Sequence, residues 1–328
     1  MTVASWTIGV DLGGTKLDVG MVDMSGKIVD RVLIKTRVKE GSKVVIQDIV
    51  AAIRALQAKN SEKVILSIGV GIAGQIDSKT GDVRFAPNLN WTDVPLQTEL
   101  SKALKLPVYV LNDVRAATWG EWLYGAGKGS NDIICIFVGT GIGGGVISDG
   151  KMLLGCSNSA GEIGHITIDV NGPKCTCGNY GCFEALASGW AIARRAKESV
   201  VKHPDSGKPL LELVNGKIDD LSAKHVLELS HSGDLLARSI VQEVSVDLVA
   251  GIAGLVNAFN PQRVIMGGGI IYGYPEFIEE IRLGVSKRAL KVAVEHLQII
   301  QASLHADAGV IGAAAYARGV CNQGGNHG

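Results

Sequence analysis

Three cysteines, one histidine and two glutamates lie within the single stretch 161–188. The cysteines are Cys175, Cys177 and Cys182, and His165 precedes the first of them by ten positions. Thiolate and imidazole ligands suit Zn²⁺, and four protein ligands are typical of a structural rather than a catalytic ion. The stretch therefore predicts a structural zinc site, with free thiols beside an unrelated surface histidine as the alternative. A closed zinc site does not need Glu162 or Glu184, so we expect these carboxylates to serve another ligand.

Glycine-rich turns at 11–16, 139–145 and 267–269 form the second chemical feature. Each of these turns follows a short apolar, β-prone run. Glycines let backbone N–H groups approach a ligand closely, which favours phosphate as the guest. In the first turn Thr15 and Lys16 add a hydroxyl and a cation. Plain hairpin turns, or a plain strand-to-helix turn at 267–269, are the alternative.

An Asn-Asp pair follows the expected strand 107–111 and precedes an expected helix at 114–123. Ligands of α/β proteins gather at the carboxyl ends of strands, which makes Asp113 a candidate catalytic residue. Aspartate is also a good helix N-cap, so this local pattern leaves both roles open. Asn88, in the polar loop 86–91, could bind a hydroxylated ligand, although its local sequence favours an Asx-turn.

The elements that must position these residues repeat along the chain. Strands at 7–10, 17–23 and 28–34 surround the first glycine turn, and strands at 131–138 and 146–148 surround the second. The repeat suggests one supersecondary unit used twice, in two related domains. Although 139–144 has the spacing G-x-G-x-x-G, an apolar strand follows it rather than a helix, which argues against a dinucleotide fold.

Composition narrows the class of protein. The 328 residues contain 32 Lys+Arg and 32 Asp+Glu, so no excess of positive charge indicates a nucleic-acid or membrane partner. The N-terminus lacks the pattern of a signal peptide, and the most apolar helical stretch, 244–259, is short for a membrane span. We therefore expect a cytoplasmic protein, in which the six cysteines favour metal binding over disulfides.

Taken together, these motifs resemble the ROK family of bacterial sugar kinases and repressors, within the hexokinase and actin-like superfamily. The most specific part is the E-I-G-H element at 162–165 followed by C-x-C-G-x-x-G-C-x-E at 175–184. The resemblance implies an α/β fold with two actin-like (RNase H-like) domains, a ligand cleft between them and a structural zinc site. The implied small domain is 1–113 plus 308–328, and the large domain is 114–307.

The resemblance also implies a role for each motif. Asp113 would be the general base. The sugar would be held by Gly74, Asn88, Asn112, Asp113, Glu162, His165 and Glu184. Phosphates and ATP would be held by Asp11, Gly13, Gly14, Thr15, Lys16, Gly139, Thr140, Gly141, Gly267, Gly268 and Gly269. The zinc ligands would be His165, Cys175, Cys177 and Cys182, and Mg²⁺ would accompany ATP.

The implied activity is ATP-dependent phosphorylation of the 6-hydroxyl of a hexose, most simply glucose, by a homodimer or homotetramer. Kinases for N-acetylglucosamine, N-acetylmannosamine or another hexose are the alternative within the class. A sugar-responsive regulator is less favoured, because only ten residues precede Asp11, too few for a helix-turn-helix. Arg115 and Trp119 depart from the small residues that the family commonly has after the Asn-Asp pair.

Overall fold

The computed structural model describes residues 5–324, and the chain divides into two compact units. Unit 1 comprises residues 1–129, 152–160 and 303–328, and unit 2 comprises 130–151 and 161–302. The boundary expected after residue 113 differs from this division. Helix α3 (Asp113–Tyr124) stays in unit 1 because it packs closely on the last helix, α12 (Ala308–Gly324). At the crossing, a Cβ added to Gly312 would lie 1.6 Å from the carbonyl oxygen of Ala116.

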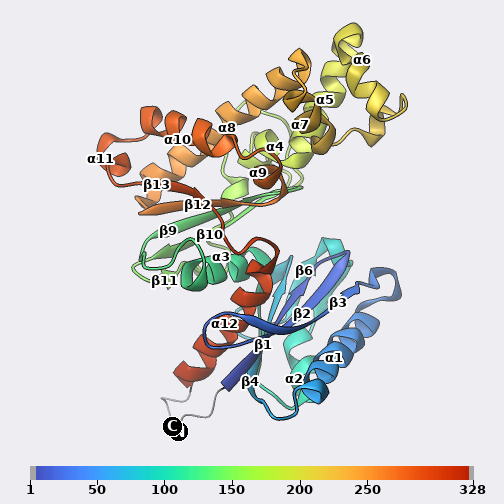
Figure 1. The fold of residues 1–328 in the computed structure, drawn as a ribbon, viewed down its shortest axis with the longest axis vertical. Coiled ribbons are helices and arrows are strands. Elements are labelled where there is room, and N and C mark those ends of the chain that lie inside the picture. Colours follow the sequence, from blue (N-terminus) through green and yellow to red (C-terminus); the bar gives the residue numbers. More distant parts are fainter. Residues whose placement is uncertain (1–4, 325–328) are drawn as a thin grey trace. The chain divides into compact units, whose positions relative to one another are not determined.

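Unit 1 is built on a five-stranded sheet of order β3-β2-β1-β4-β8 (Figure 1). The first three strands are antiparallel neighbours, whereas β1, β4 and β8 run parallel. The sheet strands and main helices are β1 (Ser5–Leu12), β2 (Lys16–Val22), β3 (Ile28–Lys35), α1 (Ser42–Lys59), β4 (Val64–Ile72), α2 (Leu96–Leu104), β8 (Val108–Asn112), α3 and α12. A small second sheet contains β5 (Gln75–Ile76), β6 (Val83–Ala86) and β7 (Trp91–Val94).

The two faces of the unit 1 sheet are covered by different helices. On one face the alternating apolar residues of β1, such as Ile8 and Val10, form a core with the apolar stripes of α1 and α2. On the other face α12 approaches so closely that a Cβ on Gly9 would lie 1.9 Å from the carbonyl oxygen of Val310. The glycines and alanines of this face therefore bring α12 directly onto the backbone of the sheet.

Unit 2 repeats the arrangement with a sheet of order β11-β10-β9-β12-β13. Its strands and helices are β9 (Ile133–Val138), β10 (Ile142–Ser148), β11 (Lys151–Met152), α4 (Phe183–Ala187), α5 (Gly189–Lys202), α6 (Pro204–Leu213), α7 (Ala223–His231), α8 (Leu235–Phe259), β12 (Arg263–Gly267), α9 (Gly269–Gly273), α10 (Phe277–Arg288), α11 (Lys291–Val294) and β13 (Gln298–Gln301). In each sheet an antiparallel hairpin (β1–β2 or β9–β10) adjoins two further strands that run parallel to its first strand. The duplication predicted from the glycine turns is therefore confirmed.

Two features of unit 2 bear on the sequence interpretation. The chain continues from the second glycine turn into strand β10, which confirms that 139–144 does not open a helix. Helix α8 begins at its N-cap Asp234, whose carboxylate accepts from the N–H of Ala237 at 2.8 Å. By length and composition alone α8 is apolar enough to cross a membrane, but most of its apolar window is buried inside the unit, as in a core helix.

Candidate functional site

The four predicted zinc ligands converge in unit 2. One ligand atom from each of His165, Cys175, Cys177 and Cys182 lies within 4.8 Å of the other three. The Cys175 Sγ to His165 Nδ1 distance is 3.7 Å, and Cys177 Sγ to Cys182 Sγ is also 3.7 Å. Tetrahedral zinc with Zn–S bonds of about 2.3 Å places its ligand sulfurs about 3.8 Å apart. The spacing therefore fits a four-coordinate structural ion.

Glycines and backbone hydrogen bonds shape the loop that carries these ligands. The N–H of Gly178 donates to the carbonyl of Cys175 at 3.0 Å, in a turn where Gly178 has a φ of +96°. Gly181 has a φ of +63°, and a Cβ there would lie 1.6 Å from the carbonyl oxygen of Asp169. Only glycine fits this position, so the glycines of the C-x-C-G-x-x-G-C pattern close the loop and leave the sulfurs facing one another.

Glu162 and His165 lie at the two ends of the short 3₁₀ helix η3 (Ile163–His165), with Glu162 as its N-cap. Residues three apart on such a helix project from the same side. Both side chains are exposed, while Ile163 and Gly164 between them are buried. Because Nδ1 of His165 faces the sulfurs, its Nε2 stays available to a ligand beside the Glu162 carboxylate.

Glu184 has a different environment from Glu162. Its Oε2 accepts the N–H of Ile142 at 2.9 Å, and a Cβ on Gly141 would lie 2.3 Å from the same oxygen. Glu184 stands on α4, which begins directly after the last predicted zinc ligand, Cys182. The carboxylate therefore connects the metal loop to the second glycine turn, a role that the sequence interpretation, which assigned it to the sugar, did not include.

The second and third glycine turns lie side by side at the carboxyl ends of β9 and β12. These strands are parallel neighbours, with Gly267 opposite Phe137. Gly268 has a φ of +91°, and a Cβ there would lie 2.4 Å from the carbonyl oxygen of Val138. Helix α5 begins against the second turn, where Gly189 and Trp190 donate their N–H groups to the carbonyls of Gly139 and Thr140.

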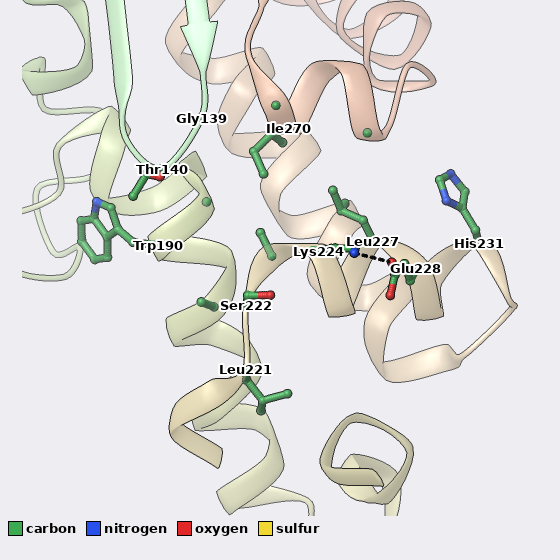
Figure 2. Close-up of a pocket in the computed structure, with 15 residues that line it drawn as sticks. Gly139, Thr140, Trp190, Leu221, Ser222, Lys224, Leu227, Glu228, His231 and Ile270 are labelled. Carbon is green, nitrogen blue, oxygen red and sulfur yellow. Dashed lines mark ion pairs between the residues drawn. The ribbon is translucent and has the colours of Figure 1, made fainter. Parts of the chain in front are cut away.

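A cavity of about 600 Å³ opens beside these two turns, wholly within unit 2 (Figure 2). Gly139 and Thr140 line one part of it, and residues of α5, of α7 with the two residues before it, and of α9 line the rest. The lining is mainly apolar, and its polar side chains include the ion pair of Lys224 and Glu228, whose Nζ and Oε1 are 3.6 Å apart. At the end of α7, His231 stacks on Tyr274 with ring centroids 4.6 Å apart.

Sequence reasoning missed the contribution of α7 to this cavity. The polar, Pro- and Gly-containing segment 202–220 predicts a surface excursion with short helices, and the structure has α6 and the 3₁₀ turn η4 (Ile218–Asp220) there. The helix that follows, with buried Val226 and Leu227 and exposed Lys224 and Glu228, has an amphipathic pattern that was available in the sequence.

In unit 1 the first glycine turn lies against the Asn88 loop. The N–H of Gly13 donates to the carbonyl of Lys16 at 3.0 Å, which closes the turn between β1 and β2. A Cβ on Gly14 would lie 2.7 Å from the carbonyl oxygen of Asn88. Asn88 is exposed on the 3₁₀ turn η2 (Pro87–Leu89), so the structure brings the first predicted phosphate turn and a predicted sugar residue together.

The charged side chains around the first turn differ in how closely they are paired with opposite charges. Burial raises the pKa of Asp11, and nearby Lys16 acts against this rise. Arg31 holds Asp18 through two hydrogen bonds of 2.7 and 2.6 Å, whereas Lys16 Nζ is 3.9 Å from that carboxylate. The exposed ammonium of Lys16 is therefore only weakly engaged, which suits a residue that meets an anionic ligand.

Asp113 is the first residue of α3, directly after β8. The N-cap is Asn112, whose Oδ1 accepts the N–H groups of Val114 and Arg115 at 3.0 and 3.2 Å. The capping alternative for Asp113 is thereby wrong. The Nδ2 of Asn112 donates to the carbonyl of Gly74 at 3.3 Å, so the Asn112 amide is engaged on both sides. In unit 1 the structure thus gathers Gly74, Asn112 and Asp113 at the carboxyl end of β8.

The similarity of this chain to known proteins extends over nearly its whole length. The ROK family profile matches residues 7–320. The chain is 37% identical over 310 residues to a glucokinase of Halalkalibacterium halodurans, covering 94% of this chain and 93% of the relative. It is also 31% identical over 311 residues to the xylose repressor of Bacillus subtilis, covering 94% of this chain but 76% of the repressor.

A solved structure agrees with these relatives. The ROK family glucokinase of Streptomyces griseus, determined in complex with glucose and AMPPNP, has a TM-score of 0.80 and 36% identity. That match covers 96% of this chain and 99% of the other. The chain therefore belongs to the ROK family, and the resemblance and the α/β fold predicted from the sequence are confirmed.

Proposed function

We propose that this ROK family protein is an ATP-dependent sugar kinase that phosphorylates the 6-hydroxyl of glucose. The observation that carries the proposal is the position of Asp113. Its half-buried carboxylate stands at the carboxyl end of a parallel strand, and Asn112, not Asp113, caps the helix that follows. Relatives with 35–38% identity over most of the chain are named glucokinases, which supports the same conclusion.

In this proposal Asp113 acts as the general base. It accepts the proton of the sugar 6-hydroxyl while that oxygen attacks the γ-phosphorus of ATP, the new O–P bond forms, and the bond to the β-phosphate oxygen breaks to release ADP. Phosphoryl transfer asks little covalent chemistry of a protein, so positioning and charge stabilisation supply most of the rate. Exposed Lys16 and the backbone of the first two glycine turns are suited to that task.

The nucleotide would occupy the cavity of unit 2. Its apolar walls suit a purine and a ribose, and its rim at Gly139 and Thr140 suits phosphates. An inorganic polyphosphate would need a track of cations, whereas Lys224, the one lysine among the described residues that line this cavity, is paired with Glu228. We therefore propose a nucleoside triphosphate as the phosphate donor.

Magnesium would accompany the phosphates, where it neutralises the charge that develops on them. The half-buried carboxylate of Asp11 fits such a cation, because carboxylate oxygens are preferred Mg²⁺ ligands and a nearby divalent charge would keep this group ionised.

Sugar recognition would use side chains whose polar atoms are exposed. Asn88, Glu162 and the Nε2 of His165 are exposed, and acceptor and donor groups of this kind match a ring of hydroxyls. Asn112 and Glu184 have hydrogen-bond partners within the protein. We therefore propose that, in addition to any contact with the sugar, Asn112 orients Asp113 and Glu184 orients the second glycine turn. The zinc ion, held by His165 and the three cysteines, would supply a rigid support for the imidazole.

Such an enzyme would work in the cytoplasm, where ATP is available and a reducing environment keeps the three cysteines from forming disulfides. Its assembly as a homodimer or homotetramer stays a prediction.

A coupled ADP-release assay tests the proposal with glucose, mannose, N-acetylglucosamine and N-acetylmannosamine. We expect turnover with glucose and ATP, and none with polyphosphate. Asp113→Asn keeps the shape of the side chain but removes the base, so turnover should fall by at least about 10³-fold while glucose binding stays measurable by calorimetry. Strong turnover with an N-acetylated sugar alone would replace glucose as substrate, and an active Asp113→Asn enzyme would remove Asp113 from its role.

A further inference from the structure

Arg115, one of the two residues that depart from the common family pattern, is buried rather than presented on the surface. It is 5% exposed, and its guanidinium donates three hydrogen bonds to one segment of unit 1. Nη1 donates to Oδ1 of Asn158 at 2.5 Å, and Nη2 donates to the carbonyl oxygens of Asn158 at 3.0 Å and Ala160 at 2.7 Å.

The segment that Arg115 holds, 152–160, is almost without regular secondary structure. After strand β11, which ends at Met152, it runs through turns to Ala160, and the chain then leaves unit 1. Asn158 has a φ of +58° and donates its Nδ2 to the carbonyl of Ile76 at 3.0 Å, so it joins Arg115 to β5. Arg115 and Asn158 together thus fix the carboxyl end of the segment on unit 1.

The position of this anchor in the chain connects it to two predicted functional residues. Arg115 lies two residues after Asp113, in the first turn of α3, and Glu162 lies two residues after Ala160. One turn of helix therefore carries both the proposed base and the side chain that fixes the start of the Glu162 turn.

We propose that Arg115 is a positioning residue for sugar recognition, which fixes the 152–160 segment and through it the backbone that presents Glu162. The inference rests on the proposed function in one respect, that Glu162 contacts the sugar. The guanidinium suits this task because its planar fork serves several acceptors at fixed angles, whereas an ammonium is a single point of donation.

The test compares Arg115→Met, which keeps the length of the side chain but removes every donor, with Arg115→Lys. For Arg115→Met we expect the KM for glucose to rise roughly tenfold, the fold-change that corresponds to about 1.4 kcal/mol. The kcat and the KM for ATP should stay within about threefold of wild type, since Asn112 still caps α3 and the nucleotide cavity lies in unit 2. Arg115→Lys should restore part of the glucose affinity.

A second readout does not depend on turnover. Chymotrypsin should cleave after Leu153 and Leu154 faster in Arg115→Met than in wild type, as mapped by mass spectrometry. Arg54→Met is the matched control, because Arg54 is exposed and donates one hydrogen bond to the carbonyl of Ala103. It should change neither the cleavage nor the KM.

The outcomes are separable. Unchanged cleavage in Arg115→Met overturns the anchor, and faster cleavage with an unchanged glucose KM overturns the link to the sugar. If Arg115→Met does not fold, Asn158→Ala, which removes one acceptor and the contact to Ile76, must show a smaller rise in the glucose KM for the inference to stand. A wild-type protein that phosphorylates no hexose overturns the proposed function, while the cleavage assay still decides whether Arg115 fixes the segment.

Discussion

The substitution Glu121→Gln should destabilise unit 1 strongly. Glu121 is fully buried on α3, and both of its carboxylate oxygens accept hydrogen bonds. Oε2 accepts from the N–H of Ala126 at 2.8 Å and from the N–H and hydroxyl of Ser303 at 3.2 and 3.3 Å. Oε1 accepts from the N–H of Leu304 at 2.7 Å.

The magnitude follows from these partners. A carboxylate is an acceptor at both oxygens, but an amide presents an NH₂ group at one of them. Whichever way the introduced amide turned, at least one buried N–H would face another donor. An unsatisfied buried donor costs about 1–3 kcal/mol, and the remaining bonds weaken because their acceptor is now neutral. We therefore expect a loss of about 3 kcal/mol in the free energy of unfolding, or about 6–12 °C in Tm at 2–4 °C per kcal/mol.

Thermal unfolding followed by tryptophan fluorescence is a suitable assay. Four of the five tryptophans, Trp6, Trp91, Trp119 and Trp122, belong to unit 1, so the signal reports mainly on that unit. Glu99→Gln is the matched control on an exposed position of α2 and should shift the free energy by no more than about 0.5 kcal/mol. A Glu121→Gln protein that melts within about 1 °C of wild type would refute the reasoning, because the buried hydrogen bonds would then contribute no net stability.

Two further predictions concern the metal loop and the helix packing. Cys175→Ser, or treatment with a chelator, should release one zinc ion per chain, detected by mass spectrometry of metals, and weaken glucose binding on the order of tenfold. Cys156→Ser, at an exposed cysteine outside the cluster, is the control, and a zinc-free protein with unchanged glucose affinity and Tm would contradict the supporting role of the ion. Gly312→Ala should cost about 3 kcal/mol or more by denaturant unfolding, because its Cβ would lie 1.6 Å from the carbonyl oxygen of Ala116. Gly254→Ala, on α8 where an added Cβ meets nothing within 4 Å, should instead stabilise by up to about 1 kcal/mol, and equal effects of the two substitutions would rule out the packing explanation.

Local patterns in the sequence predicted the parts of the site that depend on neighbouring residues. The cluster of His165 and the three cysteines is one example, because these residues lie within twenty positions of one another and the glycines that shape the loop lie between them. The strand-turn-strand character of the glycine turns is another, since apolar runs on both sides of each turn define a hairpin. In both cases the chain brings the residues together with little help from the rest of the fold.

Contacts between distant parts of the chain were beyond such patterns. The role of Glu184 depends on a hydrogen bond to Ile142, 42 residues away, and that of Arg115 on acceptors more than 40 residues away. The capping of α3 by Asn112 rather than Asp113 has another cause. Both residue types cap helices well, and a one-residue difference in the helix start decides which of them does so.

Helix α3 also makes distant amide groups depend on one another. The chain passes between its two units at four points, after residues 129, 151, 160 and 302. Near three of these points a residue of unit 1 is held by α3: Glu121 binds Ala126 and Ser303, and Arg115 binds Ala160. The amide hydrogens of Ala126 and Leu304 are far apart in sequence but donate to the same carboxylate. They should therefore lose their protection against exchange with deuterium in a single opening event, with one free energy, and behave as members of one cooperative unit.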